Sequence, residues 1–285
     1  MKSTLTPAVL ASLRATPLLA SSWYYIAAAT FSVCNQPEAV PIIFKYAIEN
    51  DAGTAGQSII IDRVDYEEPS AKSGPNRSVS PSSHYGSEDE SLIVDTAGKD
   101  PVVVQKIVRQ LREALLKGSA LGGLPKTINA LIQLRNATPP QFRDAVPFRN
   151  AVLPDGHDSI GSVSSPEEVL QEVNRGKEFW DQVYGKVARR VMGQMNSAYP
   201  DLGQYALSHI YAPLLSYTGI LSAKETSFVV VACLVPQDVN PQLKGHLRGG
   251  LNNGATVEEM MSVRDLSMRI CKLCNVSWTE EPAKL

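Results

Sequence analysis

The chain has 285 residues, enough for one large domain or two small ones, and 44% are hydrophobic, an ordinary value for a protein with a core. Its 27 basic and 29 acidic residues give a net charge of -2, so no basic excess favours nucleic acid or an anionic membrane as a partner. The longest apolar runs, such as residues 228–235, are too short to span a bilayer. Four cysteines are too few for a disulfide scaffold at this length and favour a reducing compartment.

Helix patterns dominate the first half of the chain. Residues 23–33, WYYIAAATFSV, are apolar nearly all round and predict a buried helix, so we interpret the N-terminal segment as the first helices of the fold rather than a cleaved targeting peptide. Residues 37–50 predict a second, short helix. The amphipathic pattern of residues 102–116 predicts a longer helix that ends at a glycine-rich turn over residues 118–125. Residues 126–134 predict the next helix.

Two stretches have the composition of loops. Residues from about 66 to 99 are rich in Ser, Pro, Gly and charge, so they cannot bury enough apolar surface to offset the entropy of ordering them. Residues 138–166 are rich in Pro, Asp, Gly and Ser. We interpret the first stretch as a surface insertion and the second as a linker between two halves. Residues 56–64 have a strand-like pattern.

The second half has clearer helix signals. Residues 166–197 predict one long helix, and residues 200–215 predict the next. Ser222 and Glu225 have the spacing of a capping box, which predicts a helix start. The β-branched run that follows, residues 228–235, would favour a strand by propensity alone. Because the capping box stands beside it, we predict a buried helix.

The ends of the last two helices are marked by capping residues. Asn240 is expected to cap a helix with Pro241 at its first position, and Gly254 is expected to end it. Thr256 and Glu259 form a second capping box, which predicts the start of the last helix.

The chain ends with Ala283, Lys284 and Leu285, which resemble the peroxisomal address Ser-Lys-Leu. Alanine keeps the small first side chain, and the lysine, the leucine and the free carboxylate remain for a receptor to read. Pro282 keeps the tail out of a helix. The tail predicts import into the peroxisomal matrix through an import receptor; the alternative is a frayed terminus.

The segment HLRGGLNNGATVEE resembles the helix motif of the carboxymuconolactone decarboxylase family, which includes the alkyl hydroperoxidase D proteins. The family pattern HxRGALNxG followed by T-x-E-E is matched by His246, Arg248, Gly249, Gly250, Leu251, Asn252, Gly254, Thr256, Glu258 and Glu259. The resemblance implies an all-α helical bundle that acts without a cofactor and assembles as a homo-oligomer.

The two halves of the chain resemble a degenerate internal repeat. Each runs from an apolar helix through a polar turn with proline to a short helix, and Ile42 in the first half stands where the second half has His246. The chain therefore divides as follows: a degenerate N-terminal repeat with the insertion (1–137), the linker (138–166), a C-terminal repeat with the motif (167–279) and a targeting tail (280–285).

The sequence departs from the family pattern at two places. The alkyl hydroperoxidase D proteins have a Cys-x-x-Cys before the histidine, and the matching residues here are Val239 and Gln242, so their thiol mechanism does not carry over. The family's proton-relay glutamate, near the start of the apolar helix, aligns with Ser227. Glu225 lies two residues earlier.

His246 is the main catalytic candidate. A half-buried imidazole with a shifted pKa suits general acid/base chemistry, with Arg248 to stabilise negative charge on a small organic or acyl substrate. The alternative for His246 is a core histidine bonded to a backbone carbonyl. Glu225 is a candidate partner in proton transfer, although its place in the capping box already explains it.

Other candidates lie on neighbouring predicted helices. His209 and Tyr205 could line the same cavity, and Cys233 could line it too or be a packing residue of the apolar helix. Cys271 and Cys274 share a helix face and could form a redox pair, or be two small buried hydrophobes. The histidines are scattered and no second cysteine pair has ligand spacing, so we expect no metal site.

These observations leave three functional hypotheses. The first is a peroxisomal, cofactor-free, lyase-like enzyme that uses His246. The second is a thiol-dependent peroxidase or disulfide reductase that uses Cys271 and Cys274. The third is a non-catalytic binding or scaffold protein of the peroxisome that has kept the fold.

Overall fold

The computed structural model describes residues 5–53, 93–144, 149 and 165–285. In this part of the chain every regular element is a helix and no β-strand occurs, so the predicted all-α fold is confirmed. None of these helices has both the length and the apolar character needed to cross a membrane. The strand-like residues 56–64, most of the insertion and most of the linker lie outside the described residues.

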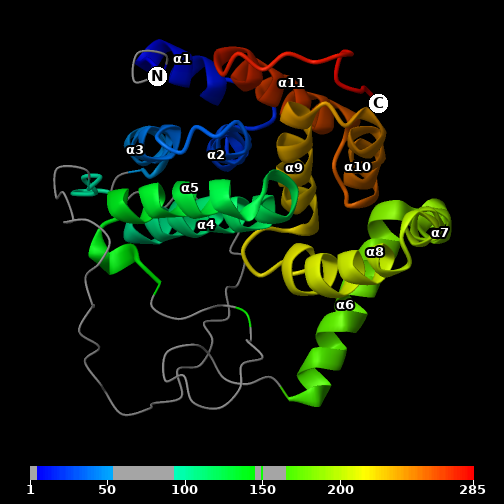
Figure 1. Ribbon diagram of the computed structural model, residues 1–285. Coiled ribbons are helices and arrows are strands. Elements are labelled where there is room, and N and C mark those ends of the chain that lie inside the picture. The colour runs from blue at the N-terminus through cyan, green and yellow to red at the C-terminus, as the bar shows by residue number, and fades with distance from the viewer. Residues whose placement is uncertain (1–4, 54–92, 145–148, 150–164) are drawn as a thin grey trace.

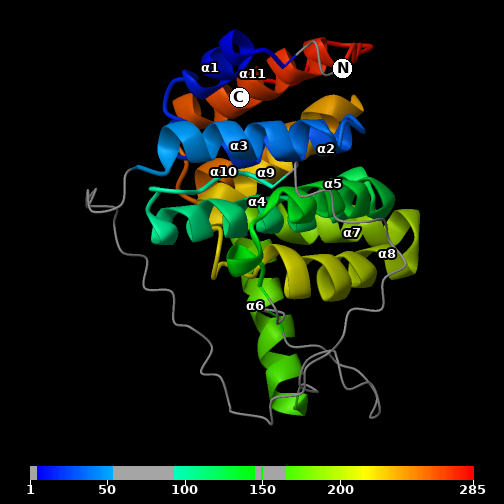
Figure 2. The same ribbon diagram turned by 90° about the vertical axis from the view of Figure 1, so that its left-hand side faces the viewer.

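The helices form stacked layers (Figures 1 and 2). Those of the described N-terminal half are α1 (Pro7–Arg14), α2 (Trp23–Val33), α3 (Ala39–Asp51), α4 (Pro101–Gly122) and α5 (Leu124–Ala137), with the short turn η2 (Pro140–Phe142). Those of the C-terminal half are α6 (Pro166–Tyr184), η3 (Gly185–Val187), α7 (Ala188–Ala198), α8 (Pro200–Tyr205), η4 (Ala206–Leu215), α9 (Ala223–Leu234), η5 (Val235–Gln237), α10 (Asn240–Asn252) and α11 (Val257–Leu273). In Figure 2 the layer of α2 and α3 lies between α1 with α11 and α4 with α5.

Two helices that are apolar on all sides form the centre of the molecule. Every residue of α2 is buried, and so are the residues of α9 from Thr226 to Leu234. The two helices pack against each other and against α4 and α11. Burial on all sides explains why the β-branched run of α9 forms a helix: tertiary contacts outweigh its strand propensity. The Ser222–Glu225 capping box at its start is present as predicted.

Helix α4 continues through the segment predicted to be a glycine-rich turn. It extends to Gly122. Two of its glycines lie where two other helices, α2 and α9, pass very close. A β-carbon on Gly122 would come within 2.5 Å of the Val33 side chain, and one on Gly118 within 3.2 Å of Cys233 Sγ. These glycines therefore allow α4 to pack tightly on α2 and α9, and the chain turns only at Gly123, whose φ is +97°.

The long helix predicted over residues 166–197 is divided in two. It ends at Tyr184 and resumes at Ala188 after one short turn. Gly185 at the break has a φ of +51°, a left-handed value that favours glycine over other residues. The first part, α6, extends away from the body of the molecule at its N-terminal end (Figures 1 and 2). The prediction of one continuous helix was wrong.

The segment predicted as one helix over residues 200–215 changes its winding after α8. It becomes the π-helical segment η4, in which the N–H of Ser216 donates to the carbonyl of Tyr211, five residues earlier, at 2.8 Å. Pro213 lies within it and has no N–H to donate, which favours departure from regular α-helical bonding. A β-carbon on Gly176 of α6 would come within 2.5 Å of Ala212, so α6 and η4 cross in close contact.

The C-terminal tail is bound to α10 and α11. The backbone N–H of Ala283 donates to Asn240 Oδ1 at 2.7 Å. The buried Arg264 guanidinium donates to the carbonyl oxygens of Pro282 at 2.6 Å and Ala283 at 2.9 Å. Asn240 therefore anchors the tail, and the prediction that its side chain caps α10 was wrong. The ends predicted at Gly254 and at the Thr256–Glu259 capping box are confirmed.

The buried apolar residues of both halves belong to one cluster. Helices α2 and α4 of the N-terminal half contribute to it together with α9 and α11 of the C-terminal half. The two halves therefore share a single core, and neither has a core of its own within the described residues.

Candidate functional site

His246 lies on α10, which packs against α6, and α6 packs in turn against η4. Its Nε2 is 3.4 Å from the hydroxyl oxygen of Tyr184, the last residue of α6. The hydroxyl of Tyr211, from η4, donates to the Tyr184 hydroxyl at 3.0 Å. Trp180 contacts both tyrosine rings, with centroid distances of 4.4 Å and 4.7 Å. Two phenols and one imidazole thus form a hydrogen-bonded chain that ends in the protein interior.

Burial sets the protonation states along this chain. His246 keeps partial solvent exposure, yet burial of its ring lowers its pKa to about 4. Burial also raises the pKa of Tyr184 and of Tyr211. At neutral pH the imidazole is therefore uncharged and both phenols carry their protons. A neutral imidazole has one nitrogen that can take a proton, so the ring can act as a general base through Nδ1 when its Nε2–H donates to the Tyr184 oxygen.

A small cavity adjoins the imidazole. Its volume is about 10 Å³, and its lining residues are Phe179, Val183, Tyr211, Leu215, Thr226, Ser227, Val230 and His246. This is the space of about one water molecule, so an organic substrate does not fit inside. Ser227 is part of the lining, and its hydroxyl donates to the carbonyl of Ala223 at 3.0 Å and accepts from the Asn253 amide at 2.9 Å.

Glu225 and Arg248 are not joined to His246 by any described interaction. One carboxylate oxygen of Glu225 accepts the Ser222 backbone N–H at 2.8 Å and closes the capping box. The other accepts the Tyr25 hydroxyl at 3.3 Å and the Gln110 amide at 3.2 Å, which ties α9 to α2 and α4. Arg248 is exposed. The Glu225 carboxylate therefore has a structural role, and the Arg248 side chain lies in solvent. The prediction that they support catalysis at His246 gains no contact from the described residues.

The three predicted lining residues occupy other places. Tyr205 and His209 form an exposed ring pair, with centroids 5.1 Å apart, and neither lines the cavity. Cys233 is fully buried in α9 against Gly118, and burial raises its pKa to about 12. It is a packing residue. The residues that meet His246 are Tyr184 and Tyr211, which sequence reasoning missed because they come from two separate helices.

Cys271 and Cys274 have a third thiol beside them, that of Cys34 at the end of α2. Hydrogen bonding to Cys271 raises the pKa of Cys34 to about 12, and hydrogen bonding to Cys34 raises the pKa of Cys274. The thiols of Cys34 and Cys274 therefore stay protonated at neutral pH, and a protonated thiol is a weak nucleophile. Among the described residues no group of three or more His, Cys, Asp or Glu could hold a metal ion.

Comparison with known proteins gives two relatives of high similarity. The protein named Peroxisomal protein 2 of Saccharomyces cerevisiae is 37% identical over 288 residues, which cover 94% of this chain and 94% of the relative. The protein of the same name from Schizosaccharomyces pombe is 41% identical over 172 residues, 60% of this chain and 73% of the relative. No family model matches the chain. No solved structure matches it.

Proposed function

The chain belongs to the Peroxisomal protein 2 family, and from this premise we propose that it is a protein of the peroxisomal matrix imported through its last three residues. Two observations support the import route. The side chains of Lys284 and Leu285 are exposed at the end of the chain. Ala283 has the small side chain that such an address has at its first position.

Deletion of Ala283, Lys284 and Leu285 tests the import route. A fluorescent protein fused to the N-terminus leaves the tail free and reports where the chain resides. The full chain should colocalise with a peroxisomal marker, and the deleted chain should be diffuse in the cytosol. A matched control, Ala283→Ser, creates the standard address and should preserve import. A deleted chain that still reaches peroxisomes would contradict the proposal.

The activity that the geometry supports best is cofactor-free proton transfer at His246, on the architecture of a carboxymuconolactone decarboxylase-like protein. The carrying observation is the chain Tyr211–Tyr184–His246. In the tautomer whose Nε2–H donates to the Tyr184 hydroxyl oxygen, Nδ1 is free to take a proton from a small organic or acyl substrate, and Tyr184 keeps the ring oriented. Because the cavity holds about one water, the substrate meets the solvent-exposed part of the residue.

Substitution of His246 tests this activity. Because no single substrate is assigned, the test uses a mixture of small molecules. The purified protein is incubated with a small-molecule extract of peroxisomes, and the compounds that it consumes are identified by mass spectrometry. His246→Gln should slow their consumption by about 10²-fold or more, the usual contribution of a general base. Tyr184→Phe, which removes only the hydroxyl, should slow it less.

His209→Gln is the matched control, because His209 is an exposed histidine that does not line the cavity. It should consume the same compounds as the unmodified protein. If the unmodified protein consumes nothing, a binding or scaffold role replaces the enzymatic one. A peroxide-induced disulfide between Cys271 and Cys274, detected by thiol trapping, would instead favour the thiol peroxidase hypothesis, against which the raised pKa of Cys274 argues.

A further inference from the structure

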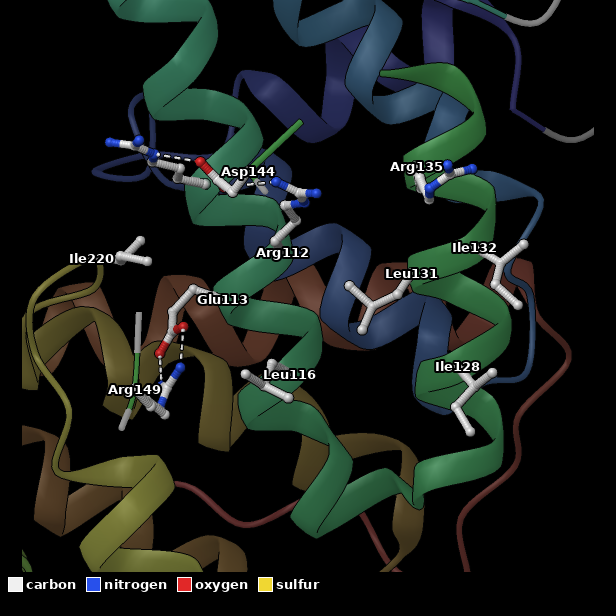
Figure 3. A pocket seen from close by; sticks show the side chains of 11 residues that line it. Arg112, Glu113, Leu116, Ile128, Leu131, Ile132, Arg135, Asp144, Arg149 and Ile220 are labelled. Atoms are coloured by element: carbon white, nitrogen blue, oxygen red, sulfur yellow. Dashed lines mark hydrogen bonds and ion pairs between the residues drawn. The ribbon is translucent and has the colours of Figure 1, made fainter. Parts of the chain in front are cut away.

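A pocket much larger than the one beside His246 lies between α4 and α5 (Figure 3). Its volume is about 530 Å³, within the range of roughly 300–1,000 Å³ that is usual for sites of small organic ligands. Asp144, Arg149 and Ile220 complete its lining beside the two helices. None of its lining residues is shared with the His246 cavity, so it is a separate site.

One wall of the pocket is apolar. Leu116 of α4 and Ile128, Leu131 and Ile132 of α5 present their side chains to it (Figure 3). Ile128 is 47% exposed and Ile132 39%, so two large aliphatic side chains of this wall remain in contact with water. A ligand that covers them gains the free energy of removing this surface from water.

The facing side of the pocket is rich in arginine. Asp144 accepts from Arg109 at 3.2 Å and from Arg112 at 2.6 Å. Arg149 makes a two-pronged ion pair with Glu113, one prong being 3.0 Å long. Arg135 of α5 also lines the pocket, so its lining residues include four guanidinium groups and two carboxylates.

We propose that this pocket binds an amphipathic carboxylate, with its acyl chain on the isoleucine and leucine wall and its anionic group among the arginines. A planar guanidinium matches a carboxylate in shape and gives paired hydrogen bonds, which a lysine does not. The apolar wall excludes a small inorganic anion as the preferred ligand, because it would leave that wall uncovered. The guanidinium groups of the lining disfavour a cationic amphiphile.

Displacement of a fluorescent amphipathic anion, anilinonaphthalene sulfonate, from the purified full-length protein tests the proposal. Decanoate, dodecanoate and tetradecanoate should displace it with rising affinity, by roughly tenfold for each two added methylenes. Dodecanol, which has the chain without the charge, should bind at least tenfold more weakly than dodecanoate. Dodecyltrimethylammonium should bind more weakly still. Equal affinity for all three dodecyl compounds would overturn the proposal.

Two variants place the binding in this pocket. Arg112→Gln should weaken dodecanoate binding about tenfold and leave dodecanol binding unchanged. Lys106→Gln is its matched control, since it removes a positive charge from the same helix at a residue outside the pocket, and it should bind like the unmodified protein. Leu131→Trp fills the pocket without altering its charge and should abolish binding of dodecanoate.

Sedimentation of the same samples separates a ligand pocket from a contact between copies of the chain. Leu131→Trp should keep the mass of the unmodified protein. If Leu131→Trp binds dodecanoate as well as the unmodified protein does, or if it changes the assembly state without affecting binding, the pocket is not the ligand site. Because no lining residue is shared with the His246 cavity, loss of turnover in His246→Gln with dodecanoate binding intact would separate this proposal from the proposed function.

Discussion

His246 is uncharged in the folded chain over the whole physiological pH range, and this has a cost in acid. A histidine in the unfolded chain binds its proton with a pKa near 6.5, whereas burial lowers the pKa of His246 in the folded chain to about 4. As pH falls from 6.5 towards 4, the unfolded state gains a proton that the folded state does not take. The folded state therefore loses stability through this window and keeps it in full above pH 6.5.

This sign leads to a measurable difference between two variants. Between pH 7 and pH 4.5 the free energy of unfolding should fall by on the order of 2 kcal/mol through His246 alone. In His246→Gln that part of the pH dependence should disappear, whereas His209→Gln, at an exposed histidine, should retain it. Urea denaturation at both pH values measures the effect. If the free energy of unfolding of His246→Gln depends on pH as steeply as that of the unmodified protein, burial does not shift the pKa of His246.

The candidate histidine could be predicted from the sequence, but its partners could not. His246 stands in a contiguous motif, so its identity needed no tertiary information. Tyr184 and Tyr211 come from the end of α6 and from a π-helical segment, and no local pattern relates them. No local pattern predicts the pocket between α4 and α5 either, because its Asp144 bonds to Arg112 and Arg109, 32 and 35 positions earlier in the chain.

At the scale of elements, one lysine ties α4 to the C-terminal half. The fully buried ammonium of Lys117 donates to the carbonyls of Leu215 at 3.0 Å and Tyr217 at 2.7 Å, and to the Thr226 hydroxyl at 2.8 Å. Glu113, one turn earlier, lies 3.7 Å away. Burial lowers the pKa of Lys117 to about 7, and these acceptors occupy its donors.

Lys117→Met should therefore destabilise the fold strongly. It leaves the buried Glu113 carboxylate and two carbonyls without this donor, so we expect a loss of about 3–5 kcal/mol in the free energy of unfolding. Lys106→Met, at a partly exposed residue of the same helix, should change stability by about 0.5 kcal/mol or less. Urea midpoints compare the two. A small loss in Lys117→Met would mean that the methionine side chain packs as well as the ion-paired lysine.

Helix positions were predicted better than helix ends. The capping boxes at Ser222 and Thr256 mark local chemistry and were confirmed. Gly118 and Gly122 predict a turn by sequence alone. They belong to a helix because α9 and α2 pack closely against them, which the sequence does not show. Gly185 sits inside a strong amphipathic pattern, and only its positive φ reveals the break.

At the scale of the molecule, one shared core has implications for stability and assembly. Since α2 and α4 pack with α9 and α11, the two halves should unfold together in one transition. The homo-oligomer implied by the family resemblance stays a prediction. Sedimentation equilibrium would check it: a mass that is a multiple of 30.9 kDa supports assembly, and a mass of 30.9 kDa at all concentrations contradicts it.

Ala283 gives both of its backbone groups to Asn240 and Arg264, so the finished molecule competes with any groove that encloses its last three residues. A chain just released from the ribosome has no such competitor. Under the proposed import route, the timing of folding relative to capture of the tail would determine how fast the protein leaves the cytosol. A variant that folds slowly would be taken up sooner than one that folds at once.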